Sequence, residues 1–320
     1  MKAVKAVKAV NVIGCGPWAQ NHIRILTQNK ILNGVFDLDE NLSNNIANQY
    51  GCKVLKTNEL VNPEENFCLF ILSSANSHYN LIKKYIPYYK NIFVEKPVVE
   101  NLDQYFEIKS LQEKYKSNIV VGHLINYHPA FQRLIQIILN NEIGEVFSIK
   151  SIRHNFGRYR VAEDVVKSLS VHDLSINFNI ARQLNAKLKS FSLHGLDFIK
   201  KNHFDEVRIF LEFNNNMKSI ISSSWIAPNK SHILQVSGSK GIVVFDDTAK
   251  IFREKLFIQF YQNDKINITK TYKKTIDIQS KIEPLKNQIN ETIKFFSGEI
   301  DYSLTPLDES YEIIKIIDSY

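Results

Sequence analysis

The sequence predicts an α/β protein: an N-terminal doubly wound parallel sheet, followed by an α+β domain with a large, mainly antiparallel, open-faced sheet. Through residue 124, short apolar runs alternate with helical patterns, which is typical of a parallel sheet with crossover helices. Over residues 146–272, strand patterns dominate and few helices interrupt them. We therefore predict domains at 1–124 and 125–320, and leave open that the last helices pack back on the first domain.

A glycine-rich turn begins the parallel part. An apolar strand ends at Ile13, and a helix follows directly after the turn Gly14-Cys15-Gly16-Pro17-Trp18-Ala19. In this pattern the first glycine allows a tight turn, the second lets a pyrophosphate approach the backbone, and the small third residue lets the helix pack closely. Proline suits the first helical position, and the helix N-terminus favours phosphate. The pattern predicts a Rossmann cofactor site made by all six residues; the alternative is a turn that merely happens to be glycine-rich.

Polar residues follow the next predicted strands. Asp37 ends the second strand at the place, about twenty residues on, where a Rossmann unit keeps the acid that binds the adenosine ribose. Small polar residues follow the apolar run 68–72, and Glu-Lys-Pro follows 91–94. Because ligands lie beyond the carboxyl ends of such strands, these segments should meet in one crevice. We assign to cofactor binding Asp37, Ser73, Ser74, His78, Glu95 and Lys96, and expect His78 to support the loop beneath the cofactor.

The second half predicts a sheet that needs a partner. Residues 206–213 and 255–260 alternate, and residues 233–237 and 241–245 flank a hairpin turn. One helix is expected near 172–184, and two more near 283–297 and 306–318. An antiparallel sheet covered on one face is most simply completed by a second subunit, so we expect a homodimer or homotetramer.

Composition narrows the class of protein. The chain has 320 residues, 44% of them hydrophobic, and no apolar run approaches the ~20 residues of a membrane span. The N-terminal Lys-Ala-Val repeat does not resemble a signal peptide, and the three cysteines show no disulfide or metal spacing. We therefore expect a cytoplasmic protein without a metal. The net charge of +7 comes from scattered lysines, which favours an anionic small molecule over nucleic acid.

In their order, these landmarks resemble the Gfo/Idh/MocA family of nicotinamide-dependent sugar oxidoreductases over essentially the whole chain. The matching segments are the glycine turn, Asp37, residues 74–78, Glu95-Lys96-Pro97, 122–129, 144–146 and Val171-His172-Asp173. Residues 122–130 and 153–160, with Ser224-Trp225 and the turn at Gly238, resemble a narrower branch, the UDP-N-acetylglucosamine 3-dehydrogenases. The resemblance implies an NAD(P)-dependent enzyme that acts on a CH–OH group.

The resemblance and the chemistry together suggest two catalytic residues. Removing a proton while hydride leaves suits a histidine, and a fixed cation stabilises the developing oxyanion; we assign these roles to His172 and Lys96. The alternative is a solvated lysine after a strand and a helix-start histidine bonded to Asp173. Many relatives carry an acid four residues before this histidine, where this chain has Ser168, and Asp164 is a possible substitute.

Substrate binding is assigned to four further residues. Arg158 and Arg160 lie in a glycine-punctuated loop suited to gripping a diphosphate, although surface arginines are the alternative. Tyr127 would stack or hydrogen-bond in the crevice, or else be an interior tyrosine. Asp173 completes the set.

The expected function is NAD-dependent oxidation of a ring hydroxyl, at C3, of a UDP-N-acetylhexosamine to a ketone. NAD is preferred to NADP because Asp37 repels a 2′-phosphate and no arginine follows it. The alternatives are another sugar, a hexuronate or a polyol as substrate, and, in another class, a non-catalytic dinucleotide-binding regulator.

Overall fold

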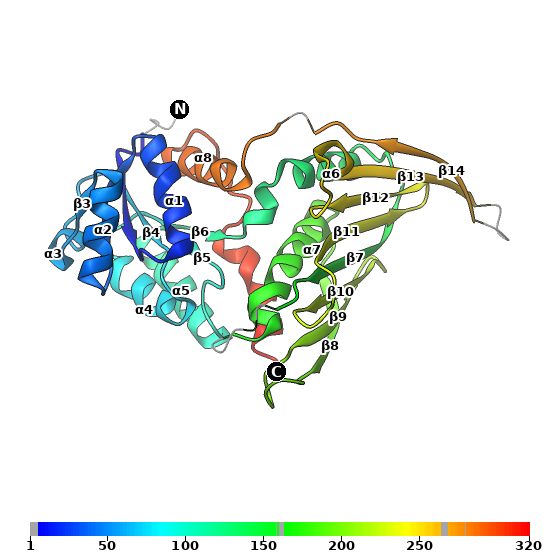
Figure 1. Ribbon diagram of the computed structural model, residues 1–320, viewed down its shortest axis with the longest axis horizontal. Helices are drawn as coiled ribbons and strands as arrows, with labels where there is room; N and C mark the ends of the chain where they lie inside the picture. The colour runs from blue at the N-terminus through cyan, green and yellow to red at the C-terminus, as the bar shows by residue number, and fades with distance from the viewer. Residues whose placement is uncertain (1–5, 158, 160–162, 264–267, 279) are drawn as a thin grey trace. The chain divides into compact units, whose positions relative to one another are not determined.

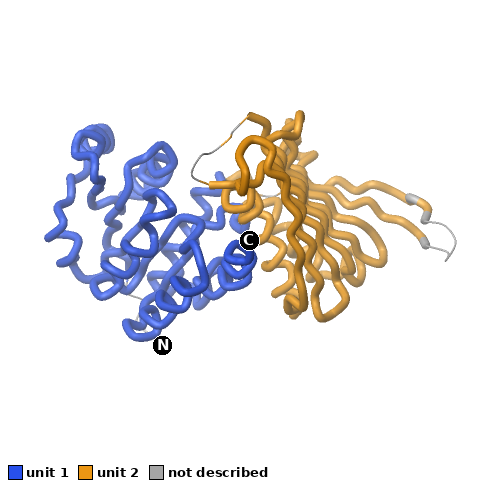
Figure 2. Tube along the Cα trace, turned by 90° about the horizontal axis from the view of Figure 1, so that it is seen from below, with its two compact units in different colours: residues 1–127, 283–320 blue, residues 128–282 orange. Residues whose placement is uncertain are grey.

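The computed structural model describes residues 6–157, 159, 163–263, 268–278 and 280–320. Contacts divide the chain into two units, residues 1–127 with 283–320 and residues 128–282 (Figure 2). The predicted domains, 1–124 and 125–320, differ from these units chiefly in the last 38 residues, 283–320, which return to the first unit. The apolar side chains of Leu285, Ile289 and Phe296 explain the return, because they join the core beneath the first helix.

The first unit is built on a six-stranded parallel sheet, as predicted. The strand order is β3-β2-β1-β4-β5-β6 (Figure 1). The strands are β1 (Ala9–Ile13), β2 (Leu32–Phe36), β3 (Lys53–Val54), β4 (Phe67–Ile71), β5 (Asn91–Glu95) and β6 (Asn118–Gly122).

Helices cover the sheet of the first unit in two groups. They are α1 (Pro17–Gln28), α2 (Glu40–Tyr50), α3 (Thr57–Leu60), α4 (Ala75–Tyr85), α5 (Leu102–Tyr115), η1 (Leu124–Tyr127), α8 (Pro284–Ser297), η4 (Leu307–Ser310) and α9 (Tyr311–Ile317). Helix α1 contacts α2 and α8, whereas α5 contacts α4 and α9. Val10 and Val12 of β1 face the first group, and the intervening Asn11 and Ile13 point the other way.

The second unit contains an eight-stranded sheet of order β14-β13-β12-β11-β7-β10-β9-β8. Its strands are β7 (Val146–His154), β8 (Leu188–Leu196), β9 (Glu206–Phe213), β10 (Lys218–Ser224), β11 (Ser231–Gly238), β12 (Gly241–Asp246), β13 (Leu256–Asn263) and β14 (Ile268–Thr275). The pairings are antiparallel except that of β7 with β10. This mixed sheet confirms the predicted fold class.

Helices of the second unit pack on one face of that sheet. They are α6 (Pro129–Leu139), the π-helical turn η2 (Val166–Ser170) and α7 (Val171–Gln183). The short η3 (Phe252–Glu254) lies in the connection between β12 and β13. On β10, Ser219 faces inward and donates to Asn177 of α7 at 2.5 Å, so the neighbouring Ile220 points to the opposite face. Ile220 and its cross-strand partner Phe210 are 40% and 41% exposed there.

Among the described residues, none of the helices reaches the length and apolarity that crossing a bilayer requires.

Candidate functional site

The glycine turn has one position at which only glycine fits. Gly14 has φ +101°, and a Cβ there would lie 2.6 Å from the backbone nitrogen of Ser73 and 2.7 Å from the carbonyl carbon of Leu72. Its own N–H donates to the carbonyl of Phe36 at 2.8 Å. The turn from β1 into α1 is therefore held between the ends of β2 and β4, at the carboxyl edge of the sheet.

Gly16 is open where Gly14 is crowded. No heavy atom lies within 4 Å of the position that a Cβ would take at Gly16, and its φ of −59° suits any residue. Gly16 is the N-cap of α1, no side chain caps that helix end, and Pro17 is the first helical residue. Open space at an uncapped helix N-terminus suits an anionic group such as a phosphate.

Asp37 lies beside this turn with its carboxylate already oriented. Its Oδ2 accepts a hydrogen bond from the Cys15 N–H at 2.7 Å, and its Oδ1 accepts one from the Asp39 N–H at 3.0 Å. Each carboxylate oxygen retains acceptor capacity for a hydroxyl, because a carboxylate has about four acceptor sites. The next side chain, Leu38, is 93% exposed and carries no charge.

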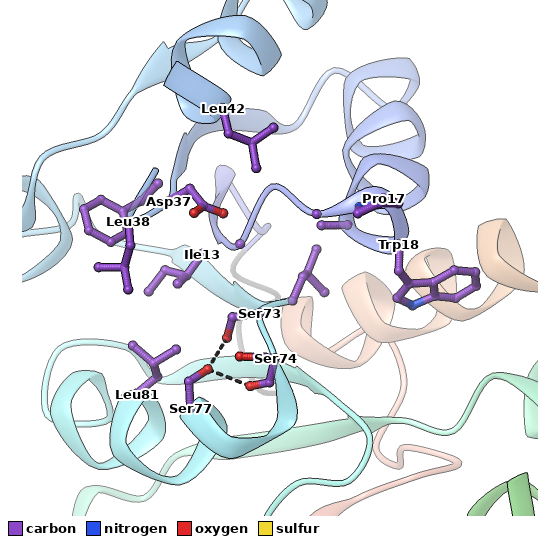
Figure 3. Close-up of a pocket in the computed structure, with 15 residues that line it drawn as sticks. Ile13, Pro17, Trp18, Asp37, Leu38, Leu42, Ser73, Ser74, Ser77 and Leu81 are labelled. Carbon is purple, nitrogen blue, oxygen red and sulfur yellow. Dashed lines mark hydrogen bonds between the residues drawn. The ribbon is translucent and has the colours of Figure 1, made fainter. Parts of the chain in front are cut away.

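These segments surround one pocket of the first unit (Figure 3). The residues lining it come from the ends of β1, β2 and β4 and from the helices that follow: Ile13, Gly14, Gly16, Pro17, Trp18, Ala19, Phe36, Asp37, Leu38, Leu42, Leu72, Ser73, Ser74, Ser77 and Leu81. The Ser77 hydroxyl contacts the Ser73 hydroxyl at 2.6 Å and donates to the Ser74 carbonyl at 2.7 Å. An open glycine, a helix N-terminus and an oriented acid in one pocket fit a dinucleotide.

Cys15 contributes its backbone to the site, while its thiol is part of the core. The side chain is fully buried, and burial, together with the nearby Asp37, raises the pKa of the thiol to about 12. The thiol therefore stays protonated at neutral pH, which fits a small residue that fills the turn.

Glu95 faces the interior instead of the predicted cofactor. Its Oε1 accepts hydrogen bonds from Trp18 Nε1 at 2.9 Å and His22 Nε2 at 3.0 Å, and its Oε2 accepts one from the Lys96 N–H at 3.2 Å. Burial by itself raises the pKa of this carboxyl, but His22 and Trp18 outweigh it and hold the pKa below its usual range. His22 was not among the predicted site residues, although its spacing of four from Trp18 places both on one side of α1.

His78 connects two of the predicted loops. It is buried in α4, with Nδ1 2.8 Å from the carbonyl oxygen of Pro97 and Nε2 3.1 Å from that of Ser73. These contacts hold the turn after β4 next to the turn after β5, which suits a supporting residue better than a ligand contact. Lys96 lies on the second of these turns at the carboxyl end of β5, partly buried, and its peptide bond to Pro97 is cis.

Tyr127 is an interior residue, so its assignment to substrate binding does not fit the structure. Its side chain is 1% exposed, and its hydroxyl lies 3.0 Å from that of Thr305 in the first unit. Burial raises the pKa of Tyr127, which keeps the hydroxyl protonated. The return of residues 283–320 to the first unit supplies this partner, and the local sequence around Tyr127 does not reveal it. Arg158 and Arg160 lie outside the described residues.

His172 lies in the first turn of α7 in the second unit, partly buried. Ser168 lies in a π-helical turn, residues 166–170, and the α-helix that carries His172 begins only at Val171. Asp164 caps this turn: its Oδ1 accepts from the N–H groups of Val166 and Lys167, both at 3.1 Å.

Asp173 is bound by Arg153, which does not fit a substrate contact. Arg153 of β7 donates from Nε to Oδ2 at 2.6 Å and from Nη2 to Oδ1 at 3.3 Å, and Asp173 is 1% exposed. Burial raises the pKa of Asp173, while the charge of Arg153 opposes the rise. The ion pair anchors the first turn of α7 to the sheet. Sequence spacing gave no sign of this contact, because β7 and α7 are brought together only by the fold.

Comparison with known proteins decides the family. Residues 8–123, which contain the glycine turn and all six strands of the parallel sheet, match the model of the GFO_IDH_MocA oxidoreductase family, NAD-binding Rossmann fold. Residues 8–123 carry the NAD-binding Rossmann domain of the Gfo/Idh/MocA oxidoreductase family. The chain is thus an oxidoreductase whose Rossmann unit takes a nicotinamide dinucleotide.

Individual family members are distant. The chain is 23% identical over 270 residues to the oxidoreductase YrbE of Bacillus subtilis, covering 79% of this chain and 78% of YrbE. It is 27% identical over 192 residues to the scyllo-inositol 2-dehydrogenase (NAD(+)) of the same organism, covering 55% of this chain and 54% of the relative. The solved structure of UDP-N-acetylglucosamine 3-dehydrogenase GnnA from Acidithiobacillus ferrooxidans superposes with a TM-score of 0.82 at 16% identity, covering 97% and 95% of the two chains.

Among the residues that the structure describes, no three His, Cys, Asp or Glu side chains are grouped to hold a metal ion.

Proposed function

We propose that this family member is an NAD-dependent dehydrogenase that oxidises the C3 hydroxyl of a UDP-N-acetylhexosamine to a ketone. The observation that carries the cofactor half is the pocket in which Gly16 is open, Asp37 is oriented by the Cys15 N–H, and Leu38 is exposed. Asp37 would accept hydrogen bonds from the adenosine ribose and repel a 2′-phosphate, and Leu38 offers a phosphate no positive charge.

The substrate half rests on the narrower resemblance. Residues 122–130 and 153–160 resemble the UDP-N-acetylglucosamine 3-dehydrogenases, and the structure named for that activity shares the fold over nearly the whole chain. The net charge of +7 favours an anionic nucleotide sugar. Arg158 and Arg160 remain the proposed diphosphate contacts. The proposed assembly is a homodimer or homotetramer.

The proposed chemistry gives one role to Lys96 and another to His172. A nicotinamide dinucleotide, held by the glycine turn and Asp37, would supply the hydride acceptor that oxidation of an alcohol carbon requires. Lys96, at the end of β5, places a positive charge beside the oxygen of that carbon as negative charge develops on it. The imidazole of His172 takes the hydroxyl proton. Buried ion pairing of the neighbouring Asp173 with Arg153 fixes the turn that carries His172.

A polyol is the second candidate substrate. It is favoured by the likeness to scyllo-inositol 2-dehydrogenase (NAD(+)), which has the higher sequence identity, although it covers 55% of this chain. The regulator of another class remains the contrasting hypothesis, because Ser168 stands where many relatives carry an acid.

Incubation with NAD and a panel of UDP-sugars, myo-inositol and scyllo-inositol, followed by absorbance of the reduced nicotinamide, separates these proposals. We expect turnover with a UDP-N-acetylhexosamine and a 3-keto product by mass spectrometry. Turnover confined to the inositols would overturn the substrate, and NAD binding without turnover of any panel member would favour the regulator.

A further inference from the structure

Trp18 is placed to contact the cofactor. It follows Gly16 by two residues, lines the pocket, and is 44% exposed, so part of the indole is accessible to a ligand. In Figure 3, Trp18 lies on the opposite side of the view from Leu38. Asp37 marks the adenosine end of the pocket and Gly16 the pyrophosphate, so the indole borders the half of the dinucleotide beyond the phosphates.

The orientation of that indole is set from below by Glu95. The hydrogen bond from Trp18 Nε1 to Glu95 Oε1, at 2.9 Å, restrains the rotation of the indole ring. The same oxygen accepts from His22, whose ring meets that of Trp18 edge-on, with centroids 5.9 Å apart. His22 in turn is fully buried against Phe93.

Glu95 also contacts the turn that carries Lys96. Its Oε2 accepts the Lys96 N–H at 3.2 Å, so one carboxylate holds donors from α1 and from the end of β5. The buried position depends on Gly122 of β6, where a Cβ would lie 2.8 Å from the Glu95 carboxyl carbon. A buried charge is retained only when its partners are well placed, and here those partners include a pocket residue and the backbone of Lys96.

We propose that Glu95 is a positioning residue, which holds the Trp18 indole against the cofactor and Lys96 against the reacting oxygen as one rigid group. This inference rests on the proposed function. It assigns Glu95 no contact with the ligand. A change at Glu95 should therefore reach cofactor binding through Trp18 and turnover through Lys96.

Glu95→Gln is the informative variant because it keeps the size and shape of the side chain but cannot accept all of the hydrogen bonds that the carboxylate accepts. If the amide oxygen faces Trp18 and His22, the amide NH₂ opposes the Lys96 N–H; if it is flipped, the NH₂ opposes Trp18. Gly122→Ala is a second, independent variant, since the added methyl group displaces the carboxylate without altering it. Glu283→Gln is the matched control, because Glu283 also binds α1, through Arg24 at 2.7 Å, but is exposed.

The first readout needs no substrate. Trp18 and the buried Trp225 are the two tryptophans of the chain, so acrylamide quenching reports mainly on Trp18. We expect NAD to protect this fluorescence in the wild type. Glu95→Gln and Gly122→Ala should raise the quenching constant of the NAD-free protein at least twofold, with the circular dichroism spectrum unchanged, and Glu283→Gln should not.

The second readout is a double-variant cycle on NAD affinity. Trp18→Phe and Glu95→Gln should each weaken NAD binding about tenfold, the scale of one hydrogen bond to a charged group. The double variant should bind NAD no more weakly than the single variant that has the lower affinity, because both changes remove the same interaction. Glu95→Gln should also lower kcat at saturating NAD about tenfold, because it disturbs the turn that carries Lys96, whereas the control Glu283→Gln should leave kcat unchanged. The positioning role would be overturned if the losses of NAD affinity in the two single variants multiplied in the double variant. It would also be overturned if Glu95→Gln and Gly122→Ala both gave the same quenching constant as the control Glu283→Gln. Failure of the wild type to turn over any sugar would instead overturn the proposed function, and the quenching result would still decide the role of Glu95.

Discussion

The Cys15 N–H donates a hydrogen bond to the carboxylate of Asp37 at 2.7 Å. This bond joins the turn after β1 to the end of β2, so the proposed phosphate and ribose contacts belong to one rigid edge of the sheet. Because Asp37 is oriented by backbone groups, it needs no rearrangement to receive a ribose.

Cofactor preference should depend on Asp37. Asp37→Ala removes the proposed acceptor for the ribose hydroxyls and the charge that repels a 2′-phosphate, so NAD affinity should fall about tenfold while NADP affinity stays level or rises. Calorimetric titration of both dinucleotides measures this. Glu40→Gln, which neutralises an exposed acid in the first turn of α2, is the control. Equal affinity of the wild type for NAD and NADP would contradict the proposed preference for NAD.

The two glycines of the turn should separate folding from binding. Gly14→Ala forces a side chain into a strained φ and against backbone atoms, which should cost about 2 kcal/mol or more of the free energy of unfolding. Gly16→Val has open space and an ordinary φ, so it should fold normally and lose NAD binding, because its side chain occupies the pyrophosphate position. Thermal denaturation and NAD titration give the two answers. NAD binding by Gly16→Val at wild-type affinity would place the cofactor elsewhere.

The features that could be predicted from the sequence are those that depend on the spacing of nearby residues. The glycine turn, the strand ends and Asp37 follow from the alternation of short apolar runs, and the parallel sheet brings their carboxyl ends together without further information. The inward position of Glu95 depends on partners on α1 and on Gly122 of β6, segments far apart in the chain. The partners of Tyr127 likewise come from the returning C-terminal residues. Ion pairs and buried networks of this kind are set by tertiary packing, which spacing in one sequence does not encode.

The Arg153–Asp173 ion pair should contribute to the stability of the fold and not to substrate binding. Arg153→Ala leaves the buried Asp173 carboxylate without its cation, and Asp173→Asn breaks the same pair, so each should cost about 3–5 kcal/mol of the free energy of unfolding. Urea denaturation measures the loss. Substrate KM should change little in whatever fraction remains folded. A full-stability Asp173→Asn with a raised KM would restore Asp173 to substrate binding.

The open face of the large sheet should join a second copy. Phe210 and Ile220 are cross-strand partners exposed on the face opposite α7, and apolar side chains in such a patch favour self-association. The wild type should sediment at micromolar concentration as a dimer or tetramer of the 37.1 kDa chain. Phe210→Asp with Ile220→Asp should reduce it to the monomer, whereas Tyr88→Asp, an exposed aromatic of the first unit, should not. A monomeric wild type would refute the proposal.

The π-helical turn formed by residues 166–170, shortly before His172, is a feature that the sequence did not predict. Its side-chain cap is Asp164, which accepts hydrogen bonds from the N–H groups of Val166 and Lys167.

The central claim is that Lys96 and His172 act on the reacting hydroxyl, while the affinity for the dinucleotide comes chiefly from the glycine turn and Asp37. Its most direct test measures turnover and NAD affinity together for Lys96→Ala, with His172→Ala beside it and Lys90→Ala, an exposed lysine just before β5, as control. We predict that turnover falls by about two orders of magnitude or more in both variants, the scale of losing a positioned charge or base. The dissociation constant for NAD should stay within about twofold of the wild-type value. Neither variant changes the hydrogen bond that orients Asp37 or the open space at Gly16. Near-normal turnover of either variant would contradict the account.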